Sequence, residues 1–461
     1  MVFSSITFLF YFLPIVLIIY YVVPNKFKNI ILLIASMFFY FYGEPKYILI
    51  MLFSIIITYL FGMLMDKYKK YSKLFLTLSI CTVAGILIYF KYANFIIENI
   101  NLWLTNKIDF IYVALPIGIS FYTFQLISYT IDVYRGDAKV QKNILKLAMY
   151  VSLFPQLIAG PIVRYTTIEK QLENREYSFE KFATGVRRFV IGLAKKVLIA
   201  NVLGELVKIF LSSNDRSILF YWMYAISNML QIYFDFSGYS DMAIGLGKMF
   251  GFEFLENFNY PYIATSVTDF WRRWHISLSS WFRDYIYIPL GGNRVSKIKW
   301  LRNILVVWLL TGLWHGAAWN FILWGLYFGI LLIIEKVFLN KYLEKLPKFL
   351  SRIYVLVIVM ISFIIFSGEN MEQIIQNIGG LVGYPGVANL SEQSIYYFKS
   401  YFVILVIAIF GATPIFKKLA NNKKINKIIN VLEPIYLLIM LIICTSYIID
   451  GSYNPFLYFR F

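Results

Sequence analysis

Ionisable side chains are scarce in this chain of 461 residues: 15% of the residues are charged, and only His275 and His315 are histidine. A typical soluble domain carries about 25% charged residues. Cysteine is equally rare. Cys81 and Cys444 lie far apart within apolar runs, which supports neither a disulfide framework nor a metal site. These shortages argue against a soluble globular protein and against a disulfide-stapled secreted one.

The chain also lacks the short motifs of the common soluble enzymes. It contains no GxSxG elbow, no Walker A loop, no HExxH pair and no GxGxxG opening a Rossmann unit. The net charge is +18, but Lys and Arg are spread over loops between apolar runs and form no single stripe. We therefore predict neither a nucleic-acid partner nor a bound metal.

What the chain has instead is apolar length, with 60% hydrophobic and 20% aromatic residues. The runs are continuous, which favours membrane-spanning helices over the alternating segments of a β-barrel. We predict an all-α polytopic membrane protein with roughly ten to twelve crossings, built as a single domain over residues 1–461. The expected spans are residues 7–23, 29–42, 47–65, 74–90, 110–133, 189–211, 218–234, 303–314, 319–334, 353–366, 397–410 and 431–449.

Loop charge predicts the orientation of these spans. The first span lacks a basic n-region and a cleavage site, so we expect a retained helix rather than a cleaved signal. Basic loops belong in the cytoplasm, which puts residues 66–73, 335–352 and 417–427 inside. The acidic loop 369–392 and the C-terminus then fall outside. The predicted location is the bacterial inner (plasma) membrane.

Two further segments depart from simple spans. Residues 147–164 contain Pro155 and Pro161 in one apolar stretch, which predicts a broken or re-entrant helix. Residues 165–188 are polar, with Glu and Lys at helical spacing, and predict a cytoplasmic surface helix.

His315 is the first candidate for chemistry, because it is the ionisable residue in the apolar junction Trp314-His315-Gly316-Ala317-Ala318. An ionisable group at such a position is costly and is by default a functional candidate, and histidine moves protons near neutral pH. A packed, neutral core histidine is the alternative.

The second candidate is the block of residues 265–294, which carries His275 among many aromatic side chains. The block also contains several arginines, whose planar guanidinium groups suit bidentate contacts to phosphates. The alternative is an amphipathic element anchored at the headgroups by Trp and Arg. The block concentrates the charged residues Asp269, Arg272, Arg273, Arg283 and Asp284.

These residues resemble the membrane-bound O-acyltransferase (MBOAT) family, and within it the AlgI-like branch of alginate O-acetyltransferases, with DltB of teichoic-acid D-alanylation more distant. The resemblance implies a helical bundle with re-entrant segments around an intramembrane funnel. The family's essential histidine corresponds to His315 and its second motif position to His275. The motifs that carry the resemblance are residues 2–5, 115–125, 159–162, 235–241, 269–294, 314–316 and 455–461.

The resemblance further implies transfer of an acetyl group from cytoplasmic acetyl-CoA, with no permanently bound cofactor, toward a hydroxyl of an exported polysaccharide. His315 would be the general base, assisted by His275. The charge density beside His275 further predicts that Arg272, Arg273 and Arg283 bind the CoA phosphates, with Asp269 and Asp284 holding some of them in place. The implied partners are an extracytoplasmic SGNH-like acetyltransferase and, in some relatives, a polysaccharide synthase complex.

Two rival functions stay open at this point. One is a D-alanyl transferase whose donor is a carrier protein. The other is a transporter of a polymer or lipid, which the lack of a visible inverted repeat disfavours. The acceptor is equally open among cellulose, an alginate-like polymer, another exopolysaccharide and a wall polymer.

Overall fold

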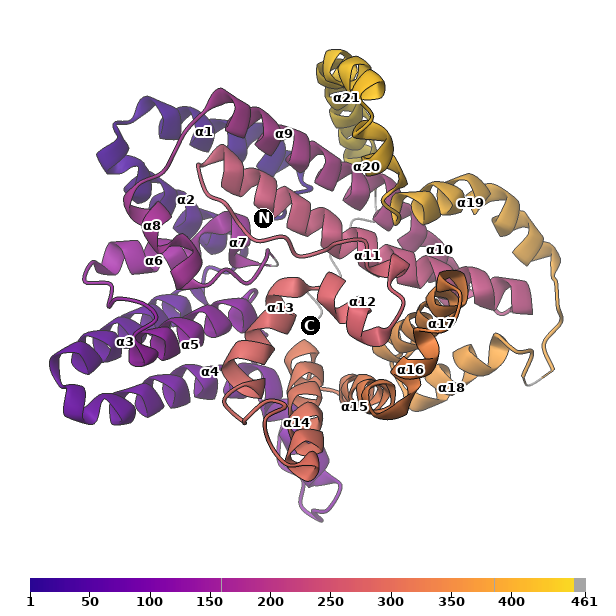
Figure 1. The fold of residues 1–461 in the computed structure, drawn as a ribbon, viewed down its shortest axis with the longest axis horizontal. Coiled ribbons are helices and arrows are strands. Elements are labelled where there is room, and N and C mark those ends of the chain that lie inside the picture. The colour runs from indigo at the N-terminus through magenta and orange to yellow at the C-terminus, as the bar shows by residue number, and fades with distance from the viewer. Residues whose placement is uncertain (159, 385, 452–461) are drawn as a thin grey trace. The chain divides into compact units, whose positions relative to one another are not determined.

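The computed structural model describes residues 1–461 except 159, 385 and 452–461, and the described part is built from helices without a strand (Figure 1). The all-α expectation is confirmed. Residue 159 of the expected turn at 159–162, and the expected ending 455–461 with its external C-terminus, lie outside the described residues.

Six helical segments of the described part are long and apolar enough to cross a membrane. This is fewer than the crossings expected from hydropathy, because several apolar runs form helices that are too short or too polar. The shorter apolar helix at Thr7–Val22 is one of them. The six are Ile48–Lys67, Lys69–Asn101, Trp319–Leu343, Lys348–Ser367, Glu392–Gly411 and Asn426–Asp450.

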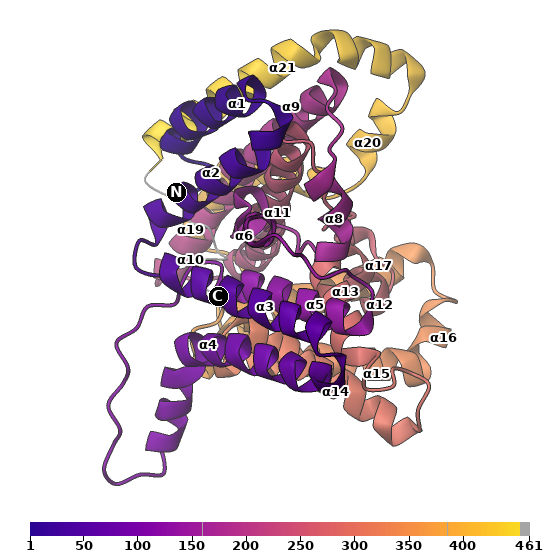
Figure 2. The same cartoon turned by 90° about the vertical axis from the view of Figure 1, so that its left-hand side faces the viewer.

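The chain divides into two compact units. Unit 1 comprises Met1–Phe189 and Ser240–Leu255. Within it, α3, α4 and α5 pack together, as Figure 2 shows. Its helices are η1 (Thr7–Phe12), α1 (Leu13–Val22), η2 (Asn25–Phe27), α2 (Lys28–Gly43), α3 (Ile48–Lys67), η3 (Lys69–Tyr71), α4 (Ser72–Asn101), α5 (Ile119–Arg135), α6 (Ile144–Ser152), α7 (Phe154–Leu157), α8 (Tyr165–Glu173) and most of α9 (Phe179–Ala194).

Proline and glycine set helix limits that hydropathy missed in unit 1. The expected span 110–133 is wrong in its first part, because α5 begins only at Ile119. Pro116 precedes that start, and Gly118 has a left-handed backbone (φ 76°) that L side chains avoid. A Cβ on Gly118 would also lie 2.9 Å from the carbonyl oxygen of Leu157.

The expected break in residues 147–164 is confirmed, since α6 ends at Ser152 and the short α7 carries Pro155 in its first turn. The expected single surface helix at 165–188 is instead two helices, α8 and the longer α9.

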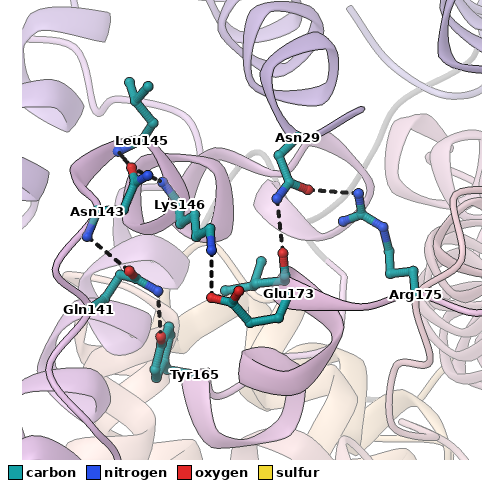
Figure 3. Close-up of polar contacts among 9 residues, drawn as sticks. Asn29, Gln141, Asn143, Leu145, Lys146, Tyr165, Glu173 and Arg175 are labelled. Atoms are coloured by element: carbon teal, nitrogen blue, oxygen red, sulfur yellow. Dashed lines mark hydrogen bonds and ion pairs between the residues drawn. The ribbon is translucent and has the colours of Figure 1, made fainter. Parts of the chain in front are cut away.

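Hydrogen bonds from polar side chains hold α8 and its flanks in unit 1 (Figure 3). Asn29 donates from Nδ2 to the Leu172 carbonyl at 2.9 Å and accepts from Arg175 at 2.7 Å. Gln141 donates to the Tyr165 hydroxyl at 2.9 Å. These bonds hold the two ends of α8, where the sequence pattern predicted one continuous helix over residues 165–188.

Unit 2 comprises Val190–Tyr239 and Glu256–Phe461. Its buried core is rich in aromatic rings contributed by α11, α12, α14, α15 and α17. The elements are η4 (Lys195–Ala200), α10 (Asn201–Ser212), most of α11 (Ile218–Met249), η5 (Pro261–Ile263), α12 (Val267–Arg273), α13 (Ile276–Phe282), η6 (Arg283–Tyr287), α14 (Lys297–His315), α15 (Trp319–Ile334), η7 (Glu335–Leu339), α16 (Asn340–Leu343), α17 (Lys348–Ser367), α18 (Met371–Gly380), α19 (Glu392–Gly411), α20 (Ile415–Ala420) and α21 (Lys423–Asp450).

The expected helix end at residue 234 is wrong, because α11 continues through the polar sequence that follows to Met249. Its two carboxylates there are neutralised by cations from elsewhere in the chain. Asp235 pairs with Lys196 in unit 2, and Asp241 pairs with Arg188 in unit 1. Ion pairing therefore lets the helix carry charge that hydropathy alone would exclude.

Glycine contacts let α14 and α15 cross closely in unit 2; Figure 1 shows the short connection between them. A Cβ on Gly312 of α14 would lie 2.3 Å from the Phe321 carbonyl oxygen, and one on Gly325 of α15 would lie 2.3 Å from that of Trp308. The two backbones touch where any larger residue would separate them. This crossing fixes the end of α14, where His315 lies.

Candidate active site

His315 is the last residue of α14 and is 3% exposed. Aromatic rings enclose its imidazole: the centroids of Trp324 and Phe366 lie 4.9 and 5.2 Å away, both edge-on. The C-terminal end of a helix carries partial negative charge, which stabilises a cation there. An imidazole that takes up a proton at this position is therefore supported by the helix that ends on it.

A cavity of about 500 Å³ lies against His315 within unit 2. This volume falls within the range typical of small-molecule sites. The apolar part of its wall comes mainly from aromatic rings on the residues Trp274, Phe321, Trp324, Phe363 and Phe366. The polar part comprises Lys208, Asn228, Gln231, Asp235, Asn320, Ser367 and Glu369 together with His315.

The cavity opens where its lining residues are exposed. Its exposed lining residues are Lys208 and Leu211 at the end of α10, and Ser367 and Glu369 at the end of α17. The residues near His315 are buried. The cavity is thus a pocket with a charged mouth and an aromatic interior that ends on an imidazole.

One face of α11 supplies most of the buried polar wall. Asn228, Gln231 and Asp235 are spaced three and four residues apart, so they line a single stripe of that helix. The site predicted from the sequence did not include Asn228 or Gln231, and residue 235 entered only as the start of the motif 235–241. The signal that would have found them is this helical spacing of polar residues within an otherwise apolar helix.

Asp235 is neutralised where it meets the cavity. Its carboxylate lies 2.6 Å from the Lys196 ammonium, and the two side chains are 2% and 3% exposed. A buried charge without such a partner is strongly destabilising. The wall therefore carries a carboxylate without net negative charge.

His275 is fully buried beside the cavity without lining it. Its ring packs edge-on against Phe236 at 4.6 Å and lies 5.9 Å from the ring of Trp314, the neighbour of His315. Its Nδ1 lies 3.2 Å from the Asn257 side-chain oxygen. That oxygen also accepts from the Ser277 backbone and hydroxyl, so the His275 Nδ1 carries the proton and donates.

Two properties mark His275 as unusual. Its backbone is left-handed (φ 44°), a costly conformation for a residue other than glycine, and such strain clusters at functional sites. Burial lowers the pKa of His275 to about 3, which keeps the ring neutral. The structure thus places His275 as a fixed, uncharged neighbour of the His315 segment.

The charged residues of the block lie on α12 and η6, and none of them lines the cavity, although Trp274 of the same block does. Arg273 pairs with Asp269 at 2.9 Å, and Arg283 pairs with Asp284 at 2.6 Å, which raises the pKa of Arg283. Arg272 is exposed. Each Arg–Asp pair carries no net charge, so Arg272 makes the larger net contribution to the positive potential.

Buried Glu335 anchors α12 from the far end of the α15 segment. Its carboxylate accepts the backbone N–H groups of Val267 and Thr268 at 2.6 and 3.1 Å. A carboxylate at a helix N-terminus satisfies amides that have no partner within the helix. The charged block is therefore fixed to the Glu335 end of that segment, whereas Asn320 at its other end lines the cavity.

Within the described residues, no three His, Cys, Asp or Glu side chains gather as a metal-binding group. The chemistry that the site itself offers is proton transfer by an imidazole in an aromatic pocket. Such a base suits the attack of a hydroxyl on an acyl carbonyl.

Comparison with known proteins shows similarity to a family of acyltransferases. Residues 138–372 match the membrane-bound O-acyltransferase (MBOAT) family. The probable alginate O-acetylase AlgI of Azotobacter vinelandii is 43% identical over 81% of this chain and 76% of its own length, and that of Pseudomonas putida is 37% identical over 100% of both. The peptidoglycan O-acetyltransferase of Helicobacter pylori is 35% identical over 86% of this chain and 82% of its own.

The matched residues 138–372 include α14 and the helices from α10 to α17 that line the cavity. Together with the apolar helices, this match makes the protein a multi-pass protein of the bacterial inner membrane and an acyltransferase. The chain belongs to the membrane-bound O-acyltransferase family.

Proposed function

We propose that this protein is an O-acetyltransferase that takes an acetyl group from cytoplasmic acetyl-CoA and passes it across the membrane for O-acetylation of an exported polysaccharide. The observation that carries the proposal is the position of His315 at a helix end on the wall of an aromatic cavity. The relatives named as alginate and peptidoglycan O-acetyltransferases support the acetyl group and a polymeric acceptor.

In this proposal His315 is the general base. It accepts the proton of the attacking hydroxyl while the hydroxyl oxygen bonds to the acetyl carbonyl carbon. The thioester C–S bond then breaks, and the thiolate leaves with the proton returned from the imidazolium. His275 assists by fixing the segment that carries His315, through its ring contact with Trp314.

Two regions of unit 2 are candidates for binding acetyl-CoA and for admitting the acceptor hydroxyl. The charged block is held by Glu335, which accepts the Val267 backbone N–H. Glu335 is also the first residue of the basic loop 335–352, which we predict to be cytoplasmic. We place CoA phosphate binding at the charged block, with Arg272, Arg273 and Arg283 as cations and Asp269 and Asp284 holding two of them. The cavity mouth includes Glu369, which begins the loop predicted to face outside.

An acceptor protein on the outer face completes the proposal. The longest loop predicted outside, residues 369–392, already contains the helix α18 and is too small to bind and orient a polymer chain. We therefore propose that the acetyl group passes to an extracytoplasmic SGNH-like acetyltransferase, in some settings beside a polysaccharide synthase. The mouth of the cavity is where that partner's hydroxyl would enter.

The experiment places the purified chain in proteoliposomes with labelled acetyl-CoA inside, and measures label on an added outer-face partner or polymer. His315→Ala and the size-matched His315→Gln should lower transfer by about 10²–10⁴-fold, because a general base contributes that much. Both variants should still insert and accumulate. Normal transfer by either variant would contradict the role of His315.

The choice of donor needs a separate arm. Acetyl-CoA is replaced by D-alanine charged on a carrier protein, the donor of the rival D-alanyl transfer. Label transferred from the carrier and not from acetyl-CoA would overturn the proposed donor. Efficient polymer acetylation without a second protein would overturn the relay and leave the acyltransferase activity in place.

A further inference from the structure

The amide side chains in the cavity wall differ in how their N–H groups are used. Asn228 donates to the Phe363 carbonyl at 3.2 Å and accepts from the Ser367 hydroxyl at 3.2 Å. Asn320 donates to the Phe366 carbonyl at 3.0 Å. Both amides therefore serve to hold the last turn of α17 against the cavity.

Gln231 lies one turn from Asn228 on the same face of α11, in the wall of the same cavity. It is 4% exposed, and among the described residues its amide makes no hydrogen bond to protein. Its amide atoms are not among the fully enclosed polar atoms, so they face the space of the cavity. An amide that faces a cavity and is not used by the protein is available to a ligand bound there.

The reaction creates a partner of the right kind. When the acceptor oxygen adds to the acetyl carbonyl, the π electrons of that C=O move onto its oxygen, which becomes negative. An N–H donor fixed beforehand next to this oxygen stabilises the transition state more than the ground state. His315 must accept a proton, so it cannot serve as that donor during the attack.

We propose that Gln231 is a further catalytic residue whose amide N–H donates to the acetyl carbonyl oxygen as negative charge develops on it. This rests on the proposed acetyl transfer at His315. Asp235, one turn further along the stripe, is an acceptor already paired with Lys196 and cannot take this role. Gln231 and His315 then act on opposite partners of one reaction, the carbonyl oxygen and the attacking hydroxyl.

The test replaces Gln231 by Met, which keeps the length and removes the hydrogen-bonding groups, and by Glu, which keeps the shape and removes the donors when ionised. Both variants should lower kcat for acetyl-CoA about 10²–10³-fold, the usual effect of losing one such donor. KM for acetyl-CoA should not change, because the bond is made in the transition state. The readout is release of the CoA thiol by the full chain in proteoliposomes that carry the same outer-face partner or polymer as acceptor of the acetyl group. The matched control is Gln376→Glu on the exposed face of α18, which should keep wild-type kinetics.

Stability separates catalysis from folding in this test. Met at position 231 removes a buried polar group without a protein partner, so the unfolding midpoint of Gln231→Met should equal or exceed that of the wild type. A large fall in the midpoint, with activity lost in proportion, would assign Gln231 a structural role and overturn the inference. A raised KM with unchanged kcat would also overturn it.

The wild type is measured first. If it releases no CoA thiol from acetyl-CoA, the proposed function fails and the inference fails with it. If the wild type turns over and Gln231→Met matches it, the Gln231 assignment alone is overturned.

Discussion

Breaking the buried pair of Lys196 and Asp235 should destabilise this protein more than removing the whole pair. The perturbation is a double-mutant cycle with Lys196→Met, Asp235→Leu and the two together. Each single variant leaves one charge buried, since the side chains are 3% and 2% exposed. The double variant leaves an apolar contact of similar volume.

The magnitude follows from the geometry. At 2.6 Å, two unit charges attract by about 6 kcal/mol at an effective dielectric constant of 20. Desolvation of both groups offsets most of that attraction, so the intact pair contributes little net stability. Removing one partner should therefore cost about 3–5 kcal/mol, and removing both should cost much less. The coupling energy should be about 3 kcal/mol or more.

The assay is unfolding of the purified chain in mixed micelles, followed by far-UV circular dichroism as the denaturing detergent increases. The control is Asp284→Asn, which breaks the exposed pair with Arg283, whose side chain is 62% exposed, and should cost at most about 1 kcal/mol. Additive losses in the Lys196–Asp235 cycle would refute the reasoning, because they would show that the two charges do not interact in the fold.

Three further outcomes are expected. Burial lowers the pKa of His275 to about 3 from 6.5, so the neutral ring stabilises the fold above pH 6.5 and that stability is lost on acidification. From pH 7 to 5 this group should cost the wild type about 2 kcal/mol, and the unfolding midpoint of His275→Asn, which tolerates the left-handed backbone, should depend less on pH. Gly325→Ala should separate α14 from α15, lower stability by about 1–3 kcal/mol and reduce acetyl transfer; wild-type kinetics with an unchanged midpoint would contradict this. Charge reversal by Arg272→Glu should weaken binding of CoA, measured by calorimetry, and unchanged affinity would refute the donor site.

The class of the fold could be read from composition, because continuous apolar runs with little charge have few alternatives to membrane helices. Helix limits were harder to predict where a distant partner decides them. The helix α11 runs past Asp235 because Lys196, 39 positions earlier in the printed numbering, neutralises the carboxylate. Nothing local to residue 235 carries that information. The start of α5 at Ile119 could have been predicted from the sequence, because Pro116 and Gly118 lie just before it.

The candidate site was predictable to the extent that rarity marks chemistry. His315 drew attention as one of two histidines, and it lies on the cavity wall. Gln231 did not, because amides are common and its significance depends on which neighbours use their N–H groups. The arginines were predicted from charge density alone, and their CoA-binding role stays a prediction. The pairing of Arg273 and Arg283 with carboxylates lowers the net charge available for it.

The position of Lys196 also bears on the cavity. Because the Lys196 ammonium lies 2.6 Å from the Asp235 carboxylate, that carboxylate adds no net negative charge to the polar stripe of α11. A buried charge without such a partner is strongly destabilising. The same ion pair thus lets α11 continue as a buried helix and sets the charge of the wall that His315 shares.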